Sequence, residues 1–295
     1  YNQEKKMTYT IQNNILKITV ASKGAELQRI EDVETGQQYM WNAGPEWPKY
    51  SPILFPIVGS LKNDTYWFEG KQYQLPRHGF ARDMEFELFE QTHNALVFVI
   101  RSNETTLSKY PFDFELYVGY MLNANGLDVT YKVHNSGNKA MYFSVGGHPA
   151  FKAPLFEGDQ YEDYVLEFDQ KETAGRWLLD NGLLQTGTEP LLDNTNELPL
   201  NKDLFFTDAI VLKHLNSSKV RFLSRKNDKG FEFDFTGFPY LGIWAAKNAD
   251  FVCIEPWCGI ADSVESNQQL IDKEGINELD AGEAFERSWH FHLIK

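Results

Sequence analysis

The chain has 295 residues, of which 42% are hydrophobic and 15% aromatic, enough apolar material for one large β domain or two smaller ones. Its formal net charge of −14 repels phosphate backbones and anionic membrane surfaces, so we expect no nucleic-acid and no membrane partner. No apolar run has membrane-spanning length, and no segment has the basic and apolar pattern of a signal peptide.

The two cysteines, Cys253 and Cys258, are separated by four residues. This is not the CxxC spacing of redox or zinc sites, and there is no second pair. We therefore expect two free, largely buried thiols in a reducing compartment, which indicates a cytoplasmic protein. The polar residues 1–6 precede Met7 and are interpreted as leader residues or as residues added to the native chain.

Alternation of apolar and polar residues predicts many short strands, with turn signals between them. In chain order the expected strands cover residues 15–20, 66–68, 72–74, 85–89, 95–101, 112–122, 127–135, 141–145, 164–168, 209–215, 219–224, 231–235, 241–246, 251–254 and 285–294. Glu69-Gly70-Lys71 predicts a hairpin between the second and third of these. No stretch has sustained helical periodicity, so the sequence predicts an all-β, antiparallel sandwich or barrel-like fold with one or two short helices.

Two long stretches, residues 36–54 and 178–204, have no regular alternation. The second is rich in Asp, Asn, Gly and Thr, and is either a linker or a long loop. Because short strands with the same apolar–polar alternation are predicted on both sides of it, we expect a loop within a single domain that covers residues 7–295. No internal repeat or low-complexity tract is present.

Three phrases contain ionisable residues that suit acid–base chemistry: His78 in RHGFAR, His148 in GGHPAF and Glu255 in CIEPW. Two imidazoles and a carboxylate can carry out paired proton transfer at neutral pH without a cofactor. Two glycines before His148 let the backbone pass close to another group. The alternatives are a surface-loop role for His78 and a purely structural role for His148.

Glu255 follows an apolar run, residues 251–254, and precedes Pro-Trp. A carboxylate at the end of a buried strand is partly desolvated, which raises its pKa and suits it to act as a base. The alternative is a buried ion pair with Arg82 or Lys62.

Other candidates are single residues. Asp208 lies among apolar residues and could accept hydrogen bonds from hydroxyl groups or cap a turn, while Trp244 and Trp257 could pack on a sugar face or in the core. His290 and His292 share one face of a strand, but no third metal ligand is near them in sequence, so we expect no metal. No GxSxG, Walker or dinucleotide glycine pattern occurs, and we expect no cofactor.

Taken together, these phrases resemble the aldose 1-epimerase (galactose mutarotase) superfamily, and in particular its LacX-like branch of mutarotase-related proteins. The resemblance covers nearly the whole chain. Its residues are Gly24-Ala25-Glu26-Leu27, residues 52–59 (PILFPIVG), the His78 and His148 phrases, Leu241-Gly242-Ile243-Trp244, Glu255 and Asp262.

The resemblance implies a large antiparallel β-sandwich, often called a supersandwich, with a groove across one sheet. It also implies that Glu255 takes the proton of the anomeric hydroxyl and that His148 protonates the ring oxygen. His78 would hold the same region of the sugar and Asp208 would accept hydrogen bonds from hydroxyls. Relatives commonly have Arg where this chain has Ser60. Lys62 or Arg77 could take the role of that arginine.

Three functions follow as hypotheses. The first is mutarotation of a free aldohexose. The second is epimerisation of a hexose 6-phosphate held by Arg82 and Arg77. The third is a non-catalytic sugar sensor on the same scaffold. In each case the partner is a small aldose sugar, and we expect a monomer or homodimer.

Overall fold

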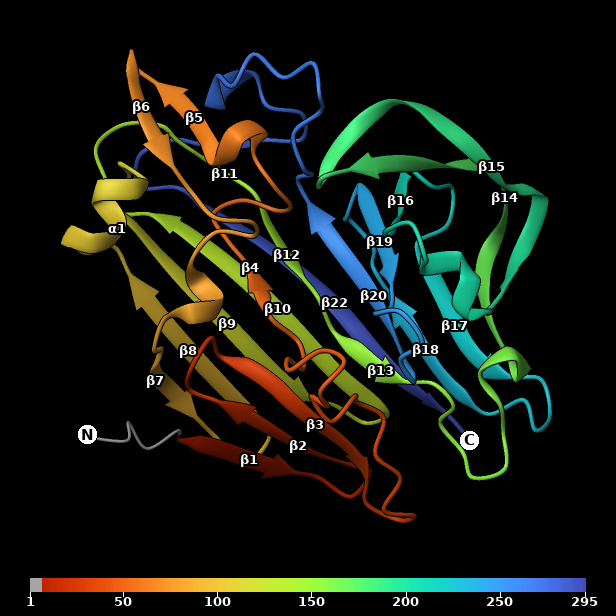
Figure 1. Cartoon of the computed structure of the whole chain (residues 1–295). Helices are drawn as coiled ribbons and strands as arrows, with labels where there is room; N and C mark the ends of the chain where they lie inside the picture. Colours follow the sequence, from red (N-terminus) through yellow and green to blue (C-terminus); the bar gives the residue numbers. More distant parts are fainter. Residues whose placement is uncertain (1–6) are drawn as a thin grey trace.

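The computed structural model describes residues 7–295, and its dominant feature is one large, mostly antiparallel sheet (Figure 1). The interpretation of residues 1–6 lies outside the described residues. The strands of the first half are β1 Thr8–Gln12, β2 Leu16–Ala21, β3 Glu26–Asp32, β4 Ile53–Leu54, β5 Thr65–Phe68, β6 Lys71–Gln74, β7 Glu87–Gln91, β8 Ala95–Arg101, β9 Phe114–Leu122, β10 Gly126–Asn135, β11 Met141–Phe143, β12 Val145–Gly147 and β13 Ala150–Lys152. Those of the second half are β14 Tyr164–Asp180, β15 Leu183–Pro199, β16 Ile210–Lys213, β17 Lys219–Ser224, β18 Gly230–Asp234, β19 Tyr240–Trp244, β20 Phe251–Cys258, β21 Asn277–Leu279 and β22 Ala284–Ile294.

The large sheet has 15 strands, in the order β4-β12-β20-β19-β16-β14-β17-β18-β22-β10-β9-β8-β7, with β13 and β15 attached at its side. A three-stranded sheet, β1-β2-β3, packs against the β7–β10 end of the large sheet (Figure 1). The Tyr9 ring lies edge-on to Phe98 at 5.5 Å, and the Tyr120 hydroxyl donates to the Ala25 carbonyl across this layer at 2.6 Å. The predicted antiparallel sandwich is confirmed.

Strand β9 shows why these residues form sheets. Its residues alternate between buried and more exposed, so Phe114, Leu116, Val118 and Tyr120 point into the core. Burying one apolar side chain of this size contributes roughly 1.5–3 kcal/mol, and the same period-two pattern recurs in β2, β8 and β10.

Helical structure is limited to short pieces, as predicted. Within residues 7–295 the one α-helix is α1, Glu104–Lys109, and its first turn is fixed by Asn103 and Thr106 in a reciprocal capping box. The predicted hairpin at Glu69-Gly70 is confirmed as β5–β6, with both turn residues at positive φ. None of the described helices is long and apolar enough to cross a membrane.

The prediction of a loop over residues 178–204 is wrong. Most of this stretch belongs to a long hairpin of β14 and β15, which Asn181-Gly182 joins. Asn181 has a φ of 50° and Gly182 a φ of 79°. Positive φ at both residues is what a two-residue hairpin turn needs if its twist is to match that of the strands. Several register shifts interrupt the pairing and many of the side chains are exposed, which removes the alternation that marks a half-buried strand.

Strands from the whole chain share one hydrophobic core, from Ile11 near the start to Phe291 near the end. We therefore propose that residues 7–295 form one domain. Cys253 and Cys258 are both free and buried, as predicted.

Candidate active site

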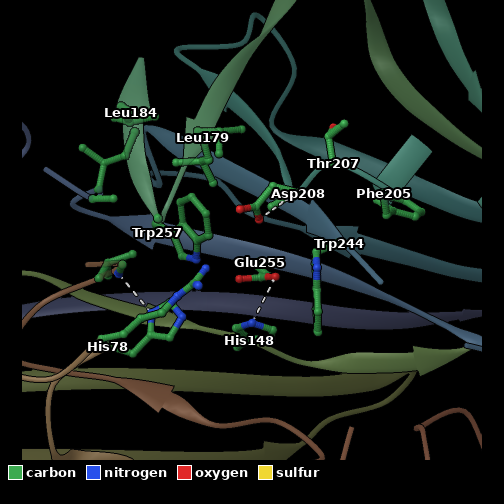
Figure 2. A pocket seen from close by; sticks show the side chains of 18 of the residues that line it. His78, His148, Leu179, Leu184, Phe205, Thr207, Asp208, Trp244, Glu255 and Trp257 are labelled. Carbon is green, nitrogen blue, oxygen red and sulfur yellow. Dashed lines mark hydrogen bonds and ion pairs between the residues drawn. The ribbon is translucent and has the colours of Figure 1, made fainter. Parts of the chain in front are cut away.

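A cavity of about 490 Å³ opens where β19 and β20 meet the β14–β15 hairpin. This volume lies within the range of roughly 300–1,000 Å³ that is common for small-molecule sites. Figure 2 shows Glu255 and His148 at its base, with Asp208 and Trp257 above them. The residues used below that line the cavity are Trp47, Arg77, His78, Arg82, His148, Leu179, Gly182, Leu184, Asp208, Trp244, Glu255 and Trp257.

Glu255 lies on β20 and is only 2% exposed. Its cross-strand partner on β19 is Gly242, and a side chain there would come within 2.4 Å of the Trp257 ring, so glycine makes room for that indole. Burial raises the pKa of Glu255 to about 8. The Arg77 charge acts in the opposite direction, and the nearby Asp208 charge adds to the rise.

His148 directly follows β12, which pairs with β20. Its Nε2 lies 3.3 Å from Oε1 of Glu255 (Figure 2). The Trp47 ring stacks on the imidazole at 4.9 Å, and Nδ1 has no hydrogen-bond partner among residues 7–295. Burial lowers the pKa of His148 to about 3, and the positive charges of the neighbouring arginines act in the same direction.

Glu255 is therefore paired, but not with the partners considered from the sequence. The ion-pair alternative with Arg82 or Lys62 is wrong, because the group within reach of the carboxylate is the imidazole of His148. With one pKa raised and the other lowered, the pair holds a single proton at neutral pH.

His78 lies beside the pair, its ring edge-on to that of His148 with centroids 5.7 Å apart. Its backbone has a φ of 67°, an uncommon value for a non-glycine residue. Nδ1 accepts a hydrogen bond from the Gly59 N–H at 2.9 Å, so the proton of the neutral ring is on Nε2. Burial lowers the pKa of His78 well below its usual value, with the His148 and Arg77 charges adding to the effect. The neutral ring is thus a fixed hydrogen-bond donor.

Two arginines lie on the same side of the cavity. Arg82 donates to the Arg77 carbonyl at 2.8 Å and lies 4.0 Å from the Asp83 carboxylate. The Arg77 guanidinium has no hydrogen bond or ion pair to any residue in 7–295, and it faces the cavity. A Cβ at Gly182 would lie 2.7 Å from Oγ of Ser60 and 3.9 Å from Nη1 of Arg77, so both side chains end near the Gly182 turn.

Of the remaining predicted residues, Asp208 and Trp244 line the cavity, and Lys62 does not. Asp208 accepts a hydrogen bond from the Ala209 N–H at 2.6 Å, and the Trp244 ring lies edge-on to His148 at 5.7 Å. The Lys62 amine donates to the carbonyls of Val264 and Ser266, at 2.9 and 3.4 Å. The structure therefore does not bring Lys62 into the cavity.

Asp262, quoted above for the resemblance, supports the cavity wall from behind. Its carboxylate forms a buried ion pair with Lys273 at 2.7 Å and accepts a hydrogen bond from the backbone N–H of Lys62 at 2.9 Å. Its backbone also bonds to Ser60 and Leu184. The backbone of Asp262 thereby joins the Ser60 loop to the β14–β15 hairpin.

Sequence reasoning missed Trp47 and the hairpin residues Leu179 and Leu184, all of which line the cavity. Trp47 lies in the irregular stretch over 36–54, and no pattern there identifies it as a cavity residue. His290 and His292 do share one face of β22, with rings 6.1 Å apart, but both lie outside the cavity.

Comparison with known proteins identifies the family of this chain. The profile of the family described as Aldose 1-epimerase matches residues 7–275. The plasmid-encoded protein LacX of Lactococcus lactis subsp. lactis is 38% identical, over 92% of this chain and 95% of LacX.

Solved structures of mutarotase-related proteins have the same fold as this chain. A galactose mutarotase related enzyme from Lactobacillus acidophilus superimposes with a TM-score of 0.93 at 37% identity, over 98% of each chain. A galactose mutarotase-like protein from Lactobacillus casei superimposes with a TM-score of 0.88 at 32% identity, over 98% of this chain and 100% of that one. The chain belongs to the aldose 1-epimerase family, a family of isomerases, and has its galactose mutarotase-like fold.

Proposed function

We propose that this protein is a mutarotase, which interconverts the α and β anomers of a free aldohexose by opening and reclosing the sugar ring. The observation that carries the proposal is the buried Glu255–His148 pair at the base of a cavity of suitable size. Ring opening needs a base at one oxygen and an acid at another in the same step, and the pair holds one proton for these two tasks.

The geometry suits the reaction because O1 and O5 of a pyranose are bonded to the same carbon, C1. Two groups that are 3.3 Å apart can therefore reach both oxygens. In the proton arrangement of carboxylate and imidazolium, Glu255 takes the O1 proton and the C1=O1 double bond forms. The C1–O5 bond breaks and O5 takes the proton from His148. Rotation about C1–C2 and the reverse steps give the other anomer, with both protons returned.

The other cavity residues hold the sugar. His78 presents Nε2–H as a fixed donor to the region of O5, and Asp208 accepts hydrogen bonds from hydroxyl groups. Trp244 offers an apolar face for the ring carbons. Arg77 takes the role of the arginine that relatives commonly have at the position of Ser60, because its guanidinium faces the cavity and ends near the same Gly182 turn as the Ser60 side chain.

A second candidate function is anomerisation of a hexose 6-phosphate. The observation in its favour is that the Arg77 guanidinium, which lines the cavity with Arg82, has no ion-pair partner in the described part of the chain, and an arginine of this kind binds phosphate well. The overall charge of −14 makes this local concentration of positive charge notable.

Polarimetry of freshly dissolved α-glucose, α-galactose and α-glucose 6-phosphate tests both candidates. We expect acceleration of the free sugars, with Glu255→Gln reduced to the spontaneous rate while still binding a non-reacting 1-deoxy sugar. Faster turnover of the phosphate would favour the second candidate. Spontaneous rates with all three sugars, together with intact sugar binding, would leave a sensor.

A further inference from the structure

We infer that His148, Cys253 and Glu255 form a binding site for a thiophilic divalent metal ion such as Zn²⁺, and that occupancy of this site blocks the acid–base pair. One ligand atom from each residue, a ring nitrogen, the thiol sulfur and a carboxylate oxygen, lies within 4.8 Å of the other two. All three residues are buried. The inference goes beyond the proposed function, since a metal ion plays no part in ring opening.

The set of donors is the kind that zinc prefers. Zinc binds nitrogen, sulfur and oxygen at about 2.0–2.3 Å in tetrahedral sites, which places ligand atoms roughly 3.3–3.8 Å apart. The His148 and Glu255 atoms are already 3.3 Å apart. The sulfur needs to move by at most about 1 Å, a shift within the reach of a side-chain rotation.

The strand framework holds the ligands rigidly on one side. Cys253 and Glu255 are two residues apart on β20, so their side chains leave the same face of the strand. β20 is paired with β13 and β19, which place Ala150 and Trp244 opposite Cys253. The cavity touches His148 and Glu255 but not Cys253, so an ion enters from the sugar side and keeps one coordination position open towards the cavity.

Metal binding has a defined chemical consequence. The thiol proton is released to solvent as the sulfur coordinates, and the metal takes the lone pairs that Glu255 and His148 need for proton transfer. Ions that require six or more oxygen ligands, such as Ca²⁺ and Mg²⁺, do not suit a site with one carboxylate. The ion is therefore an inhibitor that competes with the sugar.

The experiment uses Co²⁺ as a spectroscopic substitute for Zn²⁺. A thiolate ligand gives a sulfur-to-cobalt charge-transfer band in the near ultraviolet, which reports coordination without any activity measurement. We expect the band in the parent protein and in Cys258→Ala, its loss in Cys253→Ala, and its displacement by Zn²⁺. Cys258 is the matched control because it is an equally buried thiol that contacts the Gly237 carbonyl instead.

Inhibition gives the second readout. Zn²⁺ should suppress anomer exchange reversibly with EDTA, and Cys253→Ala should need at least about tenfold more Zn²⁺ for the same inhibition while keeping its activity without metal. If Cys253→Ala does not fold, Cys253→Ser, whose side chain has a similar volume, is used as the test variant. Absence of the band, or a band that persists without Cys253, overturns the inference. The band also appears if the protein has no mutarotase activity, so the two proposals fail separately.

Discussion

Nε2 of His148 and Oε1 of Glu255 lie 3.3 Å apart at the base of the cavity, where both side chains are buried. Burial raises the pKa of Glu255 to about 8 and lowers the pKa of His148 to about 3. Both shifts disfavour the charged forms, so the pair keeps one proton over a wide range of pH.

The pH dependence of kcat/KM should reflect this shared proton. Above about pH 8 the pair loses its proton and the rate falls, whereas on the acid side the rate persists well below pH 6.5, until His148 gains a second proton. Anomer exchange measured by NMR, with the spontaneous rate subtracted at each pH, checks the profile. An acid limb centred near pH 6.5 would contradict a buried neutral His148.

Replacing either imidazole should lower kcat, but to different extents. We expect His148→Asn to lose about 10²–10⁴-fold, since it removes a proton-transfer group. His78→Asn keeps an acceptor for the Gly59 N–H and removes only the Nε2–H donor, so a loss of about 10–100-fold is expected.

The control is His292→Asn, on β22 outside the cavity, whose Nδ1 also has no hydrogen-bond partner in the described part of the chain. Its kcat should remain within twofold of the parent. Equal losses in the three variants would point to a general loss of structure and not to the assigned roles.

Arg77→Met should raise KM by about 10–100-fold, the effect of losing a hydrogen bond from a charged group. The same change should move the basic limb of the pH profile upwards, because the Arg77 charge lowers the pKa of Glu255 and its removal lets that pKa rise. Lys62→Met is the matched control, since the Lys62 amine bonds to carbonyls outside the cavity. If the KM of Lys62→Met rises as much as that of Arg77→Met, the assignment of Arg77 is wrong.

Glu255→Gln should be more stable than the parent at alkaline pH. The folded pKa of about 8 exceeds the ordinary value of 4.5, so the folded state holds a proton that the unfolded chain gives up. The stability due to the neutral carboxyl is complete below pH 4.5 and declines as pH rises towards 8, by at most about 5 kcal/mol. Gln cannot ionise and has no such decline.

Thermal unfolding at pH 5 and pH 9 checks this expectation. The Tm difference between Glu255→Gln and the parent should be larger at pH 9, and Glu90→Gln, an exposed position on β7, should show little change with pH. A Tm difference that is the same at both values would mean that Glu255 ionises as it does in the unfolded chain.

Much of the fold followed from the sequence, because half-buried strands carry their own period-two signal. The ranges of β8 and β17 were predicted to the residue, and β9, β10 and β22 within two residues at either end. The sequence alone left open whether the fold gathers His78, His148 and Glu255; their shared site was implied by the family resemblance.

What the sequence could not give depends on tertiary neighbours. Nothing local indicates that Trp47 stacks on His148, or that the Lys62 amine turns away to backbone carbonyls. The sequence predicts Cys253 only as a free, buried thiol, and its closeness to His148 depends on the pairing of β13 with β20. The β14–β15 hairpin was missed because exposed, irregularly paired strands resemble a polar loop.

That hairpin turn gives the last prediction. Gly182 has a φ of 79°, and a Cβ there would lie 2.7 Å from Oγ of Ser60. Gly182→Ala should therefore cost about 1 kcal/mol or more in free energy of unfolding, and should raise KM because Gly182 itself lines the cavity and its displacement changes the cavity wall.

Gly187→Ala, on the same hairpin, is the matched control, because a Cβ there meets no atom within 4 Å. It should change the free energy of unfolding by less than about 0.5 kcal/mol and leave KM unchanged. Urea denaturation and anomer-exchange kinetics on both variants give the two readouts. If Gly182→Ala lost stability but kept its KM, the turn would serve the fold alone, and the hairpin would have no part in holding the sugar.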